Sequence, residues 1–221
     1  GFKIAMRDLE IRGAGNILGA EQSGHIAAVG YEMYCRLLEE AVHELKNEPR
    51  AKASSSASIE IGLSASIPKG YIPSEQRRLE AYRRLAASGT LEQLRAVRTD
   101  LTAAYGDPPR ASYKLFDLCE LRILSLAVGV RTITVRDKDV VFLTDDPAPV
   151  VAKLNVAMEG TQVAREATVR ALPPKEEGFP HEVYFRPPEK YMEPETLLRV
   201  LRKRLGGDAR EGDAPAKAGK R

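Results

Sequence analysis

A proline- and serine-rich stretch without hydrophobic periodicity divides this chain into two unequal parts. The stretch reads NEPRAKASSSAS at positions 47–58 and has the composition of a linker. Domain boundaries usually fall in such stretches, because few contacts cross them. We therefore predict a short first part at residues 1–46, a linker at 47–58 and a longer folded part at 59–205.

The longer part has the sequence patterns of an α+β domain. Apolar and polar residues alternate from Ile59 to Ile67, which predicts a strand that Pro68 ends. Helical spacing and turn residues predict the other elements. Their expected order is helices at 75–87, about 91–106 and 111–127, a hairpin of 130–135 and 140–143, a helix from Pro147, strands within 161–172 and at 183–185, and a closing helix from Pro194. We expect a small, mostly antiparallel sheet, with the 111–127 helix as the buried centre.

The composition indicates a cytoplasmic globular protein. The 221 residues carry a net charge of +3, which is too small to predict nucleic-acid binding by itself. Cys35 and Cys119 lie in apolar helical patterns and are expected to be buried thiols in a reducing compartment. The sequence shows neither a leader peptide nor an apolar run of about 18 residues, so we expect neither secretion nor a membrane span.

The two ends of the chain carry further expectations. The chain opens at Gly1 without an initiator methionine, so we expect an upstream part. Residues 206–221 contain no large apolar side chain, which predicts a disordered tail.

The first 24 residues combine charge and glycine in a way that suits contact with another molecule. Apolar residues at three- and four-residue spacing predict a short amphipathic helix, which Gly13 ends. A glycine-rich loop follows, with the long polar side chains of Arg12 and Gln22 at its two ends. The loop glycines are Gly13, Gly15, Gly19 and Gly24. Such a loop suits a phosphate backbone, and a second amphipathic helix is expected from Glu32 to Lys46.

Three other kinds of site have little support. The third loop glycine, Gly19, comes one residue too late for the dinucleotide-binding fingerprint, and no apolar strand precedes the loop. No glycine is followed by Lys-Ser or Lys-Thr, so we expect that this chain does not hydrolyse ATP alone. The three histidines are too isolated to suggest a metal site.

The basic residues of both parts of the chain can be interpreted either as structural or as partner-binding. The strongest basic cluster of the longer part consists of Arg77, Arg78, Arg83 and Arg84, with acidic residues nearby. A solvated helix face explains this cluster, and a partner surface is the alternative. Arg12 could likewise interact with a helix dipole and a neighbouring carboxylate, or with a phosphate.

Three stretches resemble the bacterial transcription-repair coupling factors. The opening GFKIAMRDLEIRGAGNILGAEQSG resembles the translocation motif that these factors share with a helicase that remodels stalled replication forks. The stretches HIAAVGYEMYCRLLEEAV and IPKGYIPSEQRRLEAYRRLA resemble the coupling factors and their C-terminal domain, which the fork helicase lacks. By this resemblance the chain is the C-terminal part of a coupling factor, from Gly1 to about Arg204.

The resemblance implies an ATP-dependent translocase on double-stranded DNA that displaces stalled RNA polymerase and recruits nucleotide-excision repair. Residues 1–46 would end the translocation module, in which Arg12 and Gln22 couple ATP-driven domain movement to motion along DNA. Residues 59–205 would form an autoinhibitory domain that packs against an N-terminal UvrB-like module and hides the surface that recruits UvrA. The parent protein would bind ATP and Mg²⁺, and this segment would bind neither.

Two rival interpretations remain open. A stand-alone protein-interaction module without motor activity would have a start codon, rather than helicase motifs, directly upstream of Gly1. The C-terminal end of the fork-remodelling helicase would require a chain that ends soon after the predicted helix at 32–46, whereas this chain continues to Arg221.

Overall fold

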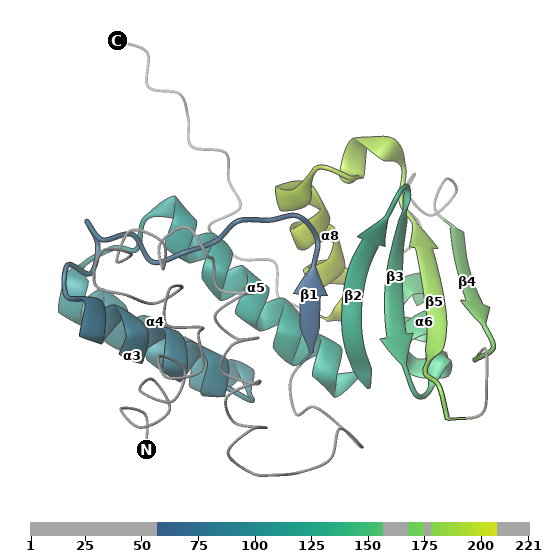
Figure 1. Cartoon of the computed structure of the whole chain (residues 1–221), viewed down its shortest axis with the longest axis horizontal. Helices are drawn as coiled ribbons and strands as arrows, with labels where there is room; N and C mark the ends of the chain where they lie inside the picture. Colours follow the sequence, from purple (N-terminus) through teal and green to yellow (C-terminus); the bar gives the residue numbers. More distant parts are fainter. Residues whose placement is uncertain (1–56, 157–167, 175–177, 207–221) are drawn as a thin grey trace, which may run out of the picture.

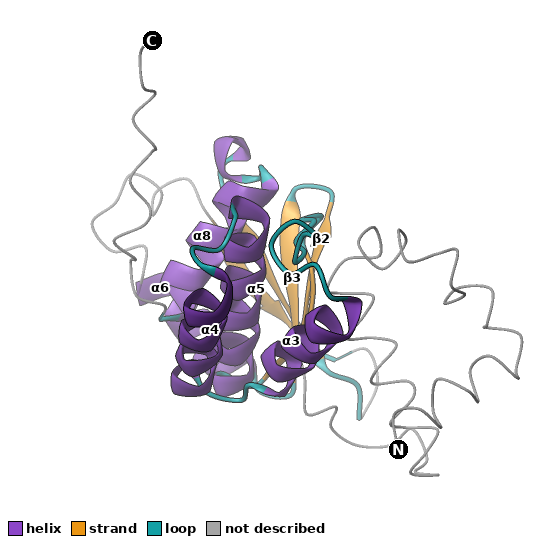
Figure 2. Cartoon of the chain, turned by 90° about the vertical axis from the view of Figure 1, so that its left-hand side faces the viewer, coloured by secondary structure: helices purple, strands orange, loops and turns teal. Residues whose placement is uncertain are grey.

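The structure, a computed structural model, describes residues 57–156, 168–174 and 178–206 (Figure 1). These residues form a β-sheet with helices on one of its faces, and a helical part beside the sheet (Figures 1 and 2). The α+β prediction is confirmed. The glycine-rich segment, the linker up to residue 56 and the tail from residue 207 lie outside the described residues.

The sheet has five strands in the order β1-β2-β3-β5-β4. β1 (Ser58–Glu60) pairs in parallel with β2 (Val130–Arg136), and the other three pairs are antiparallel. β2 and β3 (Asp139–Thr144) form the predicted hairpin. β5 (His181–Arg186) lies between β3 and β4 (Thr168–Leu172). The prediction of a small, mostly antiparallel sheet is therefore confirmed.

The helices lie close to their predicted positions. They are α3 (Glu75–Ala87), α4 (Leu91–Tyr105), α5 (Arg110–Ala127), α6 (Pro147–Val156), the 3₁₀ helix η3 (Glu189–Tyr191) and α8 (Pro194–Leu205). Local chemistry sets several ends. The hydroxyl of Ser74 accepts from the amide of Arg77, and Thr90 and Gln93 form a capping box at the start of α4. Gly106 ends α4 at a φ of 79°, a conformation that glycine adopts without steric cost.

The first strand is shorter than predicted. Alternation suggested a strand from Ile59 to Ile67, but only Ser58–Glu60 pairs with a neighbour. Gly62 has a φ of 73°, which breaks the extended backbone. Alternate side chains nevertheless pack against the core through Ile67, with Leu63 only partly buried, because the segment continues across the helices. The amide of Ile67 has a side-chain acceptor, the Tyr82 hydroxyl at 2.6 Å.

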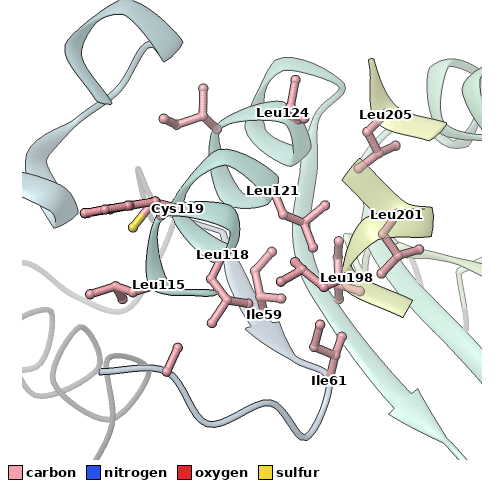
Figure 3. Packing of buried hydrophobic residues seen from close by; sticks show 14 of the residues in the cluster. Ile59, Ile61, Leu115, Leu118, Cys119, Leu121, Leu124, Leu198, Leu201 and Leu205 are labelled. Atoms are coloured by element: carbon pink, nitrogen blue, oxygen red, sulfur yellow. The ribbon is translucent and has the colours of Figure 1, made fainter. Parts of the chain in front are cut away.

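α5 is the buried centre of the domain, as predicted. It runs between the helical part formed by α3 and α4 and the sheet with α6 and α8 (Figure 1). Figure 3 shows Leu118 and Leu121 of α5 on the side of the helix that faces Ile59 of β1 and Leu198 of α8. Fully burying one such side chain contributes about 1.5–3 kcal/mol. Cys119 is fully buried in α5, as expected, and Cys35 lies outside the described residues.

Candidate partner-binding surface

The predicted basic cluster lies on α3, but its four arginines do not share one environment. Arg77 is exposed, and Arg83 and Arg84 are half-buried. The Arg83 guanidinium pairs with Glu80 at 2.9 Å, and that of Arg84 pairs with Asp100 of α4. Exposed pairs of this kind contribute little to stability, so these three side chains remain accessible to a partner.

Arg78 differs from its neighbours in the cluster. Its side chain is 7% exposed, and its Nη1 donates to the carbonyl oxygens of Ile72 and Pro73 at 2.7 and 2.9 Å. These bonds fix the loop that leads into α3. Whether the three outward arginines bind a partner stays a prediction.

A second buried arginine, Arg122 of α5, was not singled out by the sequence. Its guanidinium donates to the carbonyl oxygens of Leu85, Ala86 and Ser88 at 3.1, 2.7 and 2.7 Å. It therefore adds donors to the C-terminal carbonyls of α3, of which that of Leu85 also accepts from the Ser88 amide at 3.3 Å. The sequence signal is an arginine in the middle of a helix that is apolar on nearly every side.

A half-open groove of about 690 Å³ lies between α4 and α5. Its apolar lining includes Leu91, Leu94 and Phe116, and its polar lining includes Arg95, Arg98 and Glu120. The Arg98 guanidinium lies 5.0 Å from the centre of the Tyr113 ring, a cation–π distance.

Beneath the groove, buried charges join α5 to α8. Arg202 donates to Glu120 at 2.7 Å and pairs with Asp117 at 3.1 Å. The side chains of Arg202 and Glu120 are 5% and 7% exposed, so this contact is shielded from water. Because Glu120 also lines the groove, this contact ties the groove wall to the sheet-covering helix.

Burial perturbs one further polar group in the helical part. Tyr82 is 3% exposed and its hydroxyl accepts from the Ile67 amide. Burial raises the pKa of this phenol, against the lowering effects of the Ile67 hydrogen bond and the nearby Arg78 charge. The group stays neutral and structural.

The other predicted sites lie outside the described residues. These are Arg12, Gln22, Gly13, Gly15, Gly19 and Gly24, and they stay predictions. Within the described part of the chain, no group of three or more His, Cys, Asp and Glu side chains could hold a metal ion. The helices of that part include none that is long and apolar enough to cross a membrane.

A groove with an apolar floor and basic rim suits another protein surface. Arginine and aromatic side chains are enriched where proteins contact each other, and a preformed concave lining excludes water from the contact. The outward arginines of α3 lie on the helix next to α4, so charge extends beyond the groove. The helical part of the domain is therefore the candidate binding surface.

Comparisons with known proteins identify close sequence relatives. A family model described as the TRCF domain matches residues 61–153. Proteins named transcription-repair-coupling factor from Mycobacterium bovis, Staphylococcus epidermidis and Bacillus subtilis are 37%, 39% and 37% identical over 71%, 67% and 65% of this chain. The chain spans 14%, 13% and 12% of the length of those relatives. A crystal structure of the C-terminal domain of transcription-repair coupling factor aligns with a TM-score of 0.46 and 16% identity, covering 68% of this chain and 91% of that one.

Proposed function

This chain belongs to the transcription-repair-coupling factor family, and we propose that it is the C-terminal part of an ATP-dependent translocase on double-stranded DNA. The parent would act in the cytoplasm, displace stalled RNA polymerase and recruit nucleotide-excision repair through UvrA. Its upstream helicase lobes would bind ATP and Mg²⁺. The opening stretch with Arg12 and Gln22 would couple the movement of those lobes to the DNA backbone, as the resemblance of this stretch to the translocation motif implies.

The folded domain would restrain the motor. We assign this autoinhibitory role to the domain at residues 59–205 because its described residues form a core of their own, which allows the domain to dock and release as a unit. The partner would be the N-terminal UvrB-like module of the same protein. While docked there, the domain would cover the surface that UvrA needs.

The observation that carries this assignment is the groove between α4 and α5. It combines apolar contact area with the charges of Arg95 and Arg98, and Arg202 fixes its wall through Glu120. A rigid surface loses little conformational entropy on docking, so a modest contact can hold the restrained state. We place the restraining contact there.

Truncation of the full-length parent tests the regulatory role. Ending the chain at Arg50 should raise the basal ATPase rate and unmask UvrA binding, because the restraint is removed while the motor stays whole. Unchanged ATPase and unchanged UvrA binding would refute the assignment.

Two surface variants of the parent test where the contact lies. Arg95→Glu with Ala103→Glu reverses charge and adds bulk in the groove, and should reproduce the truncation. Arg199→Glu with Ala152→Glu makes the same changes at exposed positions of α8 and α6, and should leave the restraint intact. If truncation releases the restraint on the motor but the groove variant does not, the restraining contact lies elsewhere on the domain and the regulatory role still holds.

A further inference from the structure

The sheet has one face that no described helix covers. Side chains alternate between the two faces along each strand. Phe142 of β3 and Phe185 of β5 point toward the helices, so the residues next to each of them in its own strand point outward. Figure 1 shows α6 and α8 behind the strands, with the other face toward the viewer. Strand register places three arginines on this outward face, Arg136 of β2, Arg170 of β4 and Arg186 of β5, which we call the arginine face.

The charges of the arginine face are arranged in two layers. Asp139 accepts from Nε and Nη2 of Arg186 at 2.9 and 2.6 Å, and Arg170 approaches the same carboxylate at 3.5 Å. Arg136 donates to Glu182 at 3.1 Å. The two carboxylate side chains are only 11% and 17% exposed, whereas the three arginine side chains are 50–59% exposed. Carboxylates therefore lie beneath, and guanidinium groups form the outer layer.

The outer layer carries a positive charge toward solvent. Three guanidinium groups over two carboxylates leave a net charge of +1, and the charges of Asp137 and Lys138 in the neighbouring turn cancel. The other outward carboxylate of the sheet, Glu60, is on β1 at the opposite edge. The field outside β4 and β5 is stronger than this net charge suggests, because the anionic layer is the deeper one.

The guanidinium groups are also held in place before any partner arrives. Ion pairs with Asp139 and Glu182 fix two of them, and the Arg170 guanidinium stacks 5.1 Å from the centre of the Tyr184 ring. Each guanidinium has five donors, more than its carboxylate uses. A second anion can therefore bind with little further loss of side-chain entropy.

We propose that the arginine face binds an acidic, partly apolar segment of a partner protein. Carboxylates match the planar fork of arginine, and the exposed Leu172 beside them offers apolar contact. A nucleic acid fits less well, because Arg170 covers the Tyr184 ring that a base would stack on, and three cations are few for a phosphate backbone. This surface lies on the sheet, apart from the groove of α4 and α5, and does not depend on the regulatory role proposed above.

Binding of a defined probe to the 221-residue chain tests the proposal. A short labelled peptide of alternating glutamate and leucine should bind at low salt. In NMR spectra, the largest changes in backbone amide chemical shift on binding should be in β4 and β5. The variant Arg136→Gln with Arg170→Gln should bind at least about tenfold more weakly. Arg186 is left intact because Asp139 depends on it. The matched control, Arg110→Gln with Arg199→Gln, removes the same charge from helices and should bind like the wild type.

Two further measurements distinguish the effect of the guanidinium geometry from that of charge alone, and a protein partner from a nucleic acid. Arg136→Lys with Arg170→Lys keeps the charge without the fork, and should bind between the wild type and the glutamine variant. Equal weakening by the helix control would mean non-specific charge attraction and would overturn the proposal. So would tighter binding of a labelled duplex DNA with the same dependence on Arg136 and Arg170, since the partner would then be a nucleic acid.

Discussion

The guanidinium of Arg202 on α8 donates to the carboxylate of Glu120 on α5 at 2.7 Å, with both side chains less than a tenth exposed. Asp117, one turn earlier on α5, pairs with the same guanidinium at 3.1 Å. This contact joins residues that are 82 positions apart in the chain. It ties the last helix to the central one at the base of the groove between α4 and α5.

Removing the arginine should destabilise the domain strongly. Arg202→Ala removes a cation from two carboxylates next to the core, and breaking a buried pair in this way costs about 3–5 kcal/mol. Urea unfolding followed by circular dichroism measures the change. The double variant Arg202→Met with Glu120→Leu should recover most of the loss, because apolar side chains of similar size replace the buried pair. An Arg202→Ala variant as stable as the wild type would show that the pair contributes nothing.

The end of α3 provides a second stability test. Arg122→Met keeps the aliphatic stem but removes all three hydrogen bonds to the carbonyls of Leu85, Ala86 and Ser88. We expect a loss of about 2–3 kcal/mol, because hydrogen bonds from a charged donor are strong and a buried carbonyl that loses its donor is costly. Arg83→Met is the matched control, since its pair with Glu80 is exposed and should contribute less than about 1 kcal/mol. Similar losses in both variants would contradict the capping role.

The elements of the domain could be predicted from the sequence because their signals are local. Helical spacing, the cap at Ser74 and the hairpin turn near Asp137 all act within a few residues, and the observed elements follow them. The alternation from Ile59 to Ile67 was misleading, because burial alternates there against helices rather than within a sheet. Alternation indicates two faces, and cannot by itself identify what covers each face.

The surfaces could not be predicted, because they depend on pairs that are distant in the chain. The sequence grouped Arg78 with three neighbouring arginines, whereas its burial follows from the carbonyls of Ile72 and Pro73 that face it. The arginine face exists only because β5 lies between β3 and β4, which brings Arg186 and Arg170 to Asp139. No periodicity encodes such a strand order.

Tyr82 predicts a dependence of stability on pH. Its phenol has a pKa above 10.0 in the folded state because of burial, so the unfolded chain loses this proton first as the pH rises. The stabilising contribution is present below pH 10.0 and is lost as the pH rises through the folded-state pKa.

The variant Tyr82→Phe isolates this contribution. It removes the acceptor of the Ile67 amide, so at neutral pH it should be about 1–3 kcal/mol less stable than the wild type. Above pH 10 the wild type should lose stability more steeply than the variant, and the gap between them should narrow. Denaturant midpoints measured across this range test the prediction, and parallel curves for the two proteins would contradict it.

The last prediction concerns the coupling of ATP hydrolysis to movement along DNA, and it involves Arg12 and Gln22, which lie outside the described residues. In the reconstituted full-length parent, Arg12→Ala or Gln22→Ala should leave DNA-stimulated ATP hydrolysis substantial while abolishing displacement of stalled polymerase. One charge-assisted contact contributes about 1.5–3 kcal/mol, which is enough to break a geometric step without unfolding the motor. Arg50→Ala, which removes an arginine from the predicted linker, is the control and should keep both activities. Wild-type displacement by the Arg12 and Gln22 variants would show that the IRGAG and QSG stretches do not transmit the motion of the helicase lobes, and the proposed role of residues 1–46 would have to be abandoned.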